Sequence, residues 1–128
     1  NAPNASASAP LVALRGVSAA DIAPTIAGLA GATPPATFDG VSLLPLLSTG
    51  SRAGLPGEVF AEWVGDQTIP AWWEVRTRRF AYIELATGER ELYALRDDPY
   101  ELTNVADDPA FEAEVSRLAA TLETYRGA

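Results

Sequence analysis

The sequence contains no cysteine, histidine, lysine or methionine, and these absences exclude several kinds of chemistry. Without histidine the chain can form neither a Ser-His-Asp triad nor an imidazole metal site. Without cysteine it has no thiolate nucleophile, zinc knuckle or disulfide. Without lysine it has no Schiff-base amine and no phosphate-loop ammonium group. Carboxylates, arginine, tyrosine, serine and threonine remain for chemistry.

Positive charge is also scarce. Nine arginines face 17 aspartates and glutamates, which gives a formal net charge of −8. An acidic balance disfavours phosphate backbones and anionic lipid surfaces, because both attract basic faces. No apolar run approaches the roughly 20 residues that span a bilayer. We therefore expect no nucleic acid and no membrane as partner, while the missing cysteine leaves the cellular compartment open.

The chain has 128 residues, the size of one domain or of one piece of a larger one. Because it contains no methionine, we expect a processed piece or a cloned fragment of a longer parent. The first two residues, Asn1 and Ala2, resemble the scar of a cleaved tag, and residues 1–16 read as a flexible lead-in.

A first helix is predicted between Ser18 and Ala30. Apolar residues recur there at the i, i+4 and i+7 spacing of one helix face: Ile22, Ile26 and Leu29. Two starts compete, a capping box at Ser18 and a simple cap at Asp21. Asp21 is favoured because Pro24 then falls in the first turn, where amides are unpaired. Gly31 is expected to end the helix in a left-handed conformation.

After Gly57 the apolar period changes to two, which predicts four strands at 58–63, 72–77, 80–85 and 90–95. Gly88 supplies the positive φ of a hairpin turn between the last two. Asp108 and Pro109 then begin a final helix. Its apolar stripe consists of Phe111, Val115, Leu118, Leu122 and Tyr125. The order indicates an α+β fold, an antiparallel sheet of about four strands packed by the C-terminal helix.

The connection 64–71, between the first two strands, is the candidate rim of a ligand pocket. Its polar residues lie between large aromatic walls, and the candidates are Trp63, Asp66, Gln67, Trp72 and Trp73. The alternative is that the tryptophans fill the core. Because Trp72 and Trp73 are adjacent on a strand, they must point to opposite faces. One is therefore expected in the core and the other at least partly exposed.

Two acidic pairs and one basic cluster have simpler interpretations. Residues 97–98 and 107–108 are paired aspartates, but each pair precedes a proline, which is typical of a turn or a helix cap. An anion site is conceivable at the arginine cluster, formed by Arg76, Arg78 and Arg79. Salt-bridged sheet surface is favoured instead, with Glu58, Glu62, Glu84 and Glu91 as cross-strand partners.

Residues 91–106 read ELYALRDDPYELTNVA and resemble the C-terminal signature of sulfatases, Glu-Leu-Tyr-Asp-Leu, a gap, then Asp-Pro-x-Glu-x-x-Asn-Leu-Ala. The fixed positions of the signature are occupied by Asp98, Pro99, Glu101 and Asn104. Glu101 and Asn104 are expected to be structural, with side chains that bond local backbone amides. Ala94 departs from the usual Asp.

Three further blocks resemble sulfatase sequences in the same order. Residues 17–31 look like the Val-Ser-x-x-Asp-Leu-x-Pro-Thr helix, which puts Asp21 on the motif. Residues 38–47 resemble the Asp-Gly-x-Ser-Leu-x-Pro-Leu-Leu loop, and residues 74–83 resemble Val-Arg-x-x-x-Tyr-Lys-Tyr. The ordered set covers residues 17 to 104.

The resemblance implies the end of a type I sulfatase of the alkaline phosphatase superfamily. Such a parent hydrolyses sulfate esters with a formylglycine and a divalent cation, usually calcium. The maturation signature, Cys or Ser-x-Pro-x-Arg, is absent from this sequence. No catalytic, metal or cofactor-binding residue is therefore expected in the chain.

We expect residues 17–57 to be the tail of the sulfatase large domain and residues 58–128 to be the C-terminal subdomain. The expected partner is the missing N-terminal domain, which the chain would cap and whose pocket rim it would shape. Two alternatives stay open, a free-standing non-catalytic binding module and the tail of a related phosphomonoester or phosphonate hydrolase.

Overall fold

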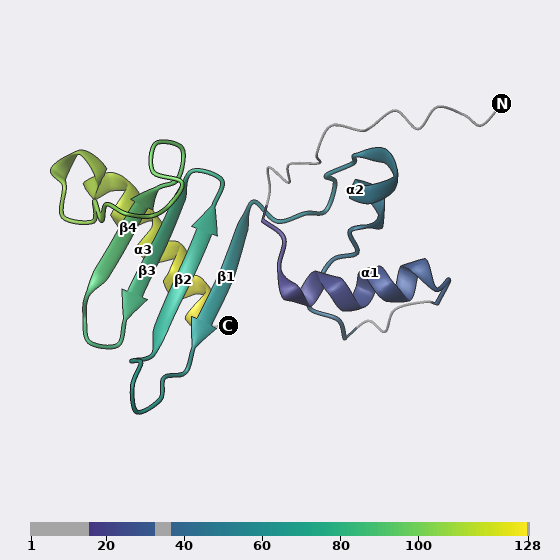
Figure 1. The fold of residues 1–128 in the computed structure, drawn as a ribbon, viewed down its shortest axis with the longest axis horizontal. Helices are drawn as coiled ribbons and strands as arrows, with labels where there is room; N and C mark the ends of the chain where they lie inside the picture. Colours follow the sequence, from purple (N-terminus) through teal and green to yellow (C-terminus); the bar gives the residue numbers. More distant parts are fainter. Residues whose placement is uncertain (1–15, 33–36, 128) are drawn as a thin grey trace. The chain divides into compact units, whose positions relative to one another are not determined.

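The computed structural model describes residues 16–32 and 37–127 (Figure 1). The predicted lead-in lies almost entirely outside these residues. Contacts divide the chain into two units, one that ends at Leu55 and one that begins at Pro56. Each unit is described by itself.

The first unit begins with a short 3₁₀ turn, η1 (Ala19–Asp21), which runs into helix α1 (Ile22–Leu29). Ser18 forms the capping box, since its hydroxyl accepts from the Ala20 amide and Asp21 accepts from the Ser18 amide. The α-helix does begin directly after Asp21, but that side chain makes no capping bond to α1. The preference for Asp21 as the capping group was therefore wrong, because an intervening 3₁₀ turn lets Ser18 cap the start while Pro24 still lies near the beginning of α1.

Glycines end both helices of this unit, as local chemistry predicts. The left-handed Gly31, with φ of 69°, follows α1. Helix α2 (Leu44–Thr49) carries Pro45 in its first turn and ends at Gly50, with φ of 72°. The Ser42 hydroxyl, just before this helix, accepts from the Leu44 amide at 3.3 Å.

The second unit is a four-stranded antiparallel sheet with strand order β1-β2-β3-β4. Its strands are β1 (Glu58–Trp63), β2 (Trp72–Thr77), β3 (Phe80–Leu85) and β4 (Arg90–Ala94). Gly88 adopts a φ of 93° in the β3–β4 turn. The predicted sheet and hairpin are confirmed, and the last strand ends one residue before its predicted end.

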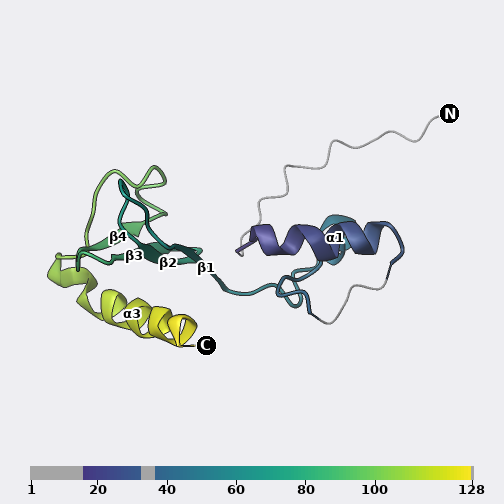
Figure 2. The same cartoon turned by 90° about the horizontal axis from the view of Figure 1, so that it is seen from below.

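Helix α3 (Glu112–Arg126) covers one face of the sheet and leaves the other without a helix (Figure 2). A 3₁₀ turn, η2 (Pro109–Phe111), precedes it, and the Asp108 carboxylate caps that turn through the Ala110 amide at 2.9 Å. The core between helix and sheet consists of Val75, Phe80, Tyr82, Leu92, Ala106, Val115, Leu118 and Leu122. The α+β class follows directly from this layering.

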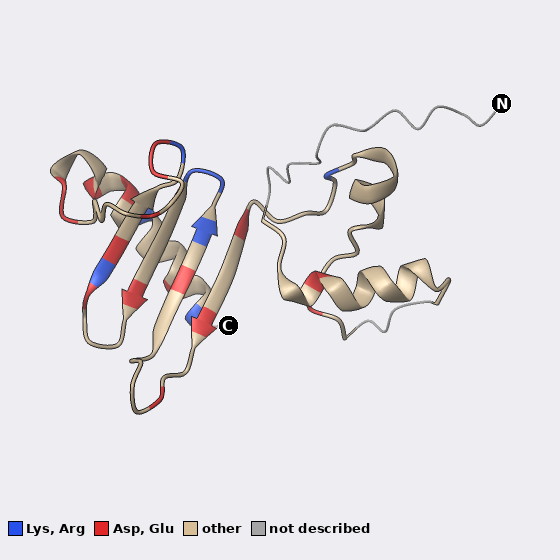
Figure 3. Cartoon of the chain, viewed as in Figure 1, with Lys and Arg blue, Asp and Glu red and all other residues tan. Residues whose placement is uncertain are grey.

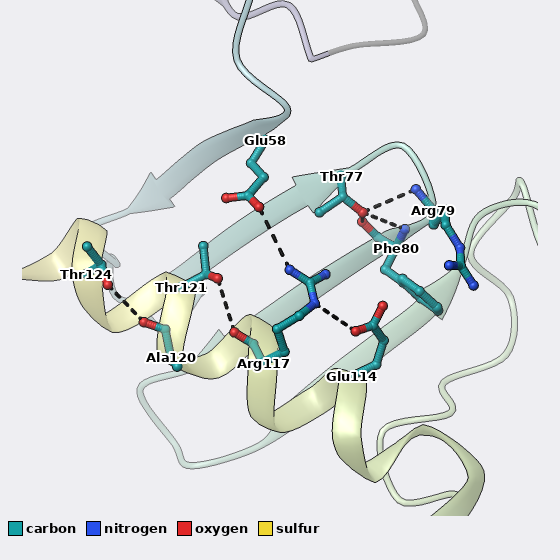
Figure 4. A network of polar contacts seen from close by, with 9 residues as sticks. All are labelled: Glu58, Thr77, Arg79, Phe80, Glu114, Arg117, Ala120, Thr121 and Thr124. Atoms are coloured by element: carbon teal, nitrogen blue, oxygen red, sulfur yellow. Dashed lines mark hydrogen bonds and ion pairs between the residues drawn. The ribbon is translucent and has the colours of Figure 1, made fainter.

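Polar contacts also join α3 to the sheet (Figure 4). Arg117 lies 3.8 Å from Glu58 of β1 and 2.8 Å from Glu114, one turn earlier on the helix. At the other end of the helix, Arg126 stacks over the Trp73 ring at 4.0 Å and lies 3.4 Å from Glu84. The two arginines therefore fix the helix near both of its ends.

Candidate functional site

The face of the sheet opposite α3, called here the open face, consists of three rows of side chains that run across the strands. The first row is Trp63, Trp72 and Leu85. The second row is Ala61, Glu74, Ile83 and Glu91. The third row is Val59, Arg76, Ala81 and Tyr93. One end of this face is thus apolar and aromatic, and carboxylates lie beside it.

The two adjacent tryptophans point to opposite faces, as predicted. Trp73 packs against the core beneath α3, whereas Trp72 lines a cleft on the open face. Neither is fully buried. The predicted rim set is consequently divided by the strand geometry, since Trp63 and Trp72 are cross-strand neighbours and Trp73 lies on the covered face.

Asp66, one of the residues predicted to contact a ligand, instead closes the loop 64–71 on itself. Asp66 Oδ1 accepts from the amides of Thr68 and Ile69, both at 2.7 Å. These backbone hydrogen bonds, Ile69 first, hold the pKa of Asp66 below its usual range. Asp66 therefore shapes the loop, while Gln67 is exposed.

The arginine cluster does not pair as predicted. Arg76 bonds Glu74 on its own strand and Glu101 in the segment after β4, each at 2.8 Å. Arg78 and Arg79 lie in the β2–β3 turn, outside the strands, where the Thr77 hydroxyl accepts from the amides of Arg79 and Phe80 (Figure 4). The expected cross-strand partners are engaged elsewhere, since Glu58 pairs with Arg117 and Glu84 with Arg126. Only Arg76 of the three arginines therefore lies on a strand face.

The signature segment after β4 is a turn that the Asp98 side chain closes. Asp98 Oδ2 accepts from the Thr103 amide at 2.8 Å, and its backbone carbonyl accepts from the Glu101 amide at 3.2 Å. Backbone amides, those of Leu102 and Thr103 first, lower the pKa of Asp98. Pro99 occupies the second position of this turn, where its fixed φ fits. The turn interpretation of this aspartate is supported.

Glu101 has the one positive φ of a non-glycine residue in the described part of the chain, 56°. We expected its carboxylate to bond a local backbone amide. Instead, the carboxylate bonds the side chain of Arg76, 25 residues earlier. The left-handed conformation is unfavourable for such a residue. In this turn the Glu101 carboxylate lies against the open face, where it bonds Arg76.

The Asn104 side chain hydrogen-bonds backbone groups at the outer edge of β4, where no further strand of the described residues pairs with them. Its Oδ1 accepts from the amides of Leu92 and Ala106, at 3.0 and 2.9 Å, and its Nδ2 donates to the carbonyl of Arg90 at 3.1 Å. The adjacent Val105 amide donates to the Leu92 carbonyl. Asn104 is thus structural, as expected, and two of its partners are distant in sequence.

Asp21 is equally structural and is only 3% exposed. Its Oδ2 accepts from the Ser18 amide at 2.8 Å and its Oδ1 from the Val41 amide at 2.7 Å. Thr25 adds a parallel link, because its hydroxyl donates to the Asp21 carbonyl and accepts from the Leu43 amide. The helix motif and the following loop motif therefore hold each other by side-chain-to-backbone bonds.

The sequence analysis did not identify a cleft of about 270 Å³ on the open face, lined by Trp72, Glu74, Ile83, Leu85 and Glu91. Period-two spacing could have grouped the residues of each strand on one face. Only the strand register shows that Glu91 of β4 lies opposite Ile83 of β3 and so lines the same cleft. Within residues 16–32 and 37–127 there is no group of three or more acidic residues that could hold a metal ion. No helix in the same ranges is long and apolar enough to cross a membrane.

Comparison with known proteins gives consistent matches. A family model described as N-sulphoglucosamine sulphohydrolase, C-terminal, matches residues 9–128. The chain is 33% identical over 109 residues to the Delta 4,5-hexuronate-2-O-sulfatase of Bacteroides thetaiotaomicron, which covers 82% of this chain and 22% of that protein. It is 32% identical over 116 residues to the choline-sulfatase of Rhizobium meliloti, which covers 88% and 22%. The chain thus spans about a fifth of the length of these curated relatives.

A solved structure from another enzyme class is also similar. The phosphonate monoester hydrolase of Agrobacterium radiobacter superposes with a TM-score of 0.72 at 32% identity, covering 88% of this chain and 25% of that chain. This chain therefore resembles a similar fraction, about a quarter or a fifth, of a phosphonate hydrolase and of the two sulfatases.

Proposed function

The chain belongs to the family of N-sulphoglucosamine sulphohydrolase C-terminal domains, and from this premise we propose that it caps the catalytic domain of a sulfatase and shapes the rim of its pocket. The parent would be a sulfuric ester hydrolase, and the chain alone would not be an enzyme. The curated relatives named above are both sulfatases. Their greater length supports a role for this chain as one part of a larger protein.

The observation that carries the proposal is the surface of α1. Its apolar stripe, predicted from periodicity, stays in solvent, with Ile22 55%, Ile26 60% and Leu29 68% exposed. The buried side of the helix instead holds Pro24 and Thr25. A contiguous apolar helix face is rarely left bare in a monomeric protein. We therefore assign residues 17–57 to the tail of the large domain, where this stripe would be covered.

Residues 58–128 are proposed as the C-terminal subdomain. The boundary between the two compact units, which lies after Leu55, supports a division of the chain near this point. The rim role is assigned to the loop 64–71 and the aromatic residues at its base. Val64 is 84% exposed, Trp63 is 39% exposed, and a rigid sheet positions both. Asp66 would hold the shape of the loop, so Gln67 and Trp63 are the groups assigned to face a ligand. Trp72, the cross-strand neighbour of Trp63, would support them on the open face, and Trp73 would support them from the covered side.

The residues of this chain do not fit the formylglycine and the divalent cation of a type I sulfatase. The sequence contains no Cys or Ser-x-Pro-x-Arg, and it has no histidine or lysine to serve as acid or base. No step of sulfate ester hydrolysis is assigned to its side chains. Both groups would belong to the preceding domain, the proposed partner of this chain.

The test is to read the coding sequence upstream and to express the full-length protein. We expect a Cys or Ser-x-Pro-x-Arg motif upstream, turnover of an aryl sulfate by the full-length protein, and no turnover by the 128-residue chain. The isolated chain should bind calcium no more tightly than about millimolar. Hydrolysis by the chain alone, above a blank without protein, would contradict the assignment.

A phosphonate or phosphomonoester hydrolase is the second candidate, favoured by the similarity to the Agrobacterium enzyme. Parallel assays of the full-length protein on aryl sulfate, aryl phosphate and aryl phosphonate separate the two. A gene that encodes no catalytic domain upstream would instead favour a free-standing binding module.

A further inference from the structure

We propose that the cleft on the open face receives an arginine side chain from the preceding sulfatase domain, with its guanidinium over Trp72 and between Glu74 and Glu91. This inference rests on the proposed function for the identity of the partner. It adds that the partner domain presents an arginine side chain to this face of the sheet.

The shape of the cleft fits one long side chain. Trp72, Ile83 and Leu85 form an apolar floor, and Glu74 and Glu91 lie on either side of Ile83 in the cross-strand row. Its volume, about 270 Å³, lies below the range of roughly 300–1,000 Å³ typical of small-molecule pockets. An aliphatic stem that ends in a cation would cover the floor and reach the carboxylates.

The covered face of the same sheet already binds a guanidinium in this way. Arg126 of α3 stacks over the Trp73 ring at 4.0 Å and lies 3.4 Å from Glu84, which is the cross-strand neighbour of Trp73. The open face also presents a tryptophan near carboxylates, but Leu85 lies opposite Trp72 and the carboxylates of Glu74 and Glu91 lie in the next row of side chains. The guanidinium on that side would come from outside the chain.

Charge on the open face favours a cation over other occupants. Glu74 and Glu91 each use one carboxylate oxygen in a described bond, to Arg76 and to the Tyr93 hydroxyl. Glu101 adds a third carboxylate, which pairs with Arg76, so the described charges of the open face include three carboxylates and one arginine. Acidic residues occur on all four strands of the sheet (Figure 3), but on the strands only Glu74 and Glu91 lie on the open face; the acidic residues of β1 and β3 lie on the covered face.

The same charges argue against the competing occupants. A sulfated ligand would be repelled by the two carboxylates, and a second copy of the chain would bring four of them together. Arginine is preferred to lysine because a planar guanidinium can stack on indole and bond a carboxylate at the same time.

The binding test uses the 128-residue chain and a neutral isostere. The chain, labelled with ¹⁵N, is titrated with N-acetyl-L-arginine methylamide and separately with N-acetyl-L-citrulline methylamide, which has the same shape without the charge. We expect saturable shifts of the Trp72 indole N–H and the amides of Ile83 and Leu85 with the arginine probe. The citrulline probe should bind roughly fivefold more weakly, the upper end for one partly exposed ion pair.

Variants locate the site. Glu91→Gln keeps the shape of the side chain and an acceptor for Tyr93, and it should weaken the arginine probe by a similar factor. Glu112→Gln, exposed at the start of α3, is the matched control and should change nothing. Equal binding of both probes, or shifts that do not include Trp72, would overturn the proposal. Sulfatase activity of the full-length protein does not enter this test, so either inference can fail alone.

Discussion

At the scale of single residues, the sulfatase motifs are explained by hydrogen bonds to the backbone. Asp21 joins the start of η1 to the loop at Val41, and Asp98 closes the turn that it opens. Asn104 pairs the exposed edge of β4. Each of these side chains replaces a backbone partner that regular structure does not supply there. Their role in the motif is structural.

Replacing Asn104 with alanine should lower the free energy of unfolding by about 1–2 kcal/mol, since three modest hydrogen bonds are lost. Chemical denaturation followed by tryptophan fluorescence measures this change. Thr103→Ala is the matched control, because only the backbone amide of Thr103 takes part in the described turn. Equal stability of the two variants would refute the bridging role of Asn104.

At the scale of elements, the helices differ in what holds them. Helix α3 is fixed by a buried stripe of Val115, Leu118 and Leu122 and by arginines near both ends. Helix α1 is fixed by polar bonds and by close backbone packing. Gly40 lies so near η1 that a Cβ there would be 2.1 Å from the Ala20 carbonyl oxygen. The glycine of the Asp-Gly motif thus permits the contact between loop and helix.

Gly40→Ala should therefore separate the loop from the helix, at a cost of about 1–3 kcal/mol for the overpacked contact. Faster hydrogen exchange of the Val41 and Leu43 amides, which Asp21 and Thr25 bind, would report it. The control is Gly57→Ala, where a Cβ meets nothing within 4 Å. Unchanged exchange in the Gly40 variant would contradict this account.

At the scale of the whole molecule, an acidic chain carries a half-covered sheet and a helix with a bare apolar stripe. Both features are consistent with a part that is completed by another domain. Two tyrosines, the buried Tyr82 and the partly buried Tyr93, also tie stability to pH. Burial and then the hydrogen bond to Glu91 raise the pKa of Tyr93 to about 12, and burial and the bond to Glu84 raise the pKa of Tyr82.

Stability should be constant from neutral pH to about pH 10 and should fall above it. Tyrosine in the unfolded chain ionises near pH 10, so between pH 10 and 12 the unfolded state loses its protons first and is favoured. Urea unfolding at pH 8, 10 and 11 measures the effect. Tyr93→Phe should reduce the fall between pH 10 and 11. A free energy of unfolding that does not decrease over this interval would rule out the raised pKa values.

Features that depend on neighbouring residues could be predicted from the sequence. Period-two patterning identified the four strands, Gly88 identified the hairpin, and Asp108 with Pro109 identified the start of the final helix. These patterns succeed because alternation, caps and positive φ are properties of a few consecutive residues. The ordered motifs similarly indicated the sulfatase family, which the family model confirms.

Contacts between residues distant in the sequence could be identified only in the folded chain. Besides a near partner on its own element, Arg76 bonds Glu101, 25 residues away, and Arg126 bonds Glu84, 42 residues away. The cleft beside Trp72 likewise depends on the register of three strands. Local spacing could not identify these contacts, because loop lengths and strand register fix them only when the chain has folded.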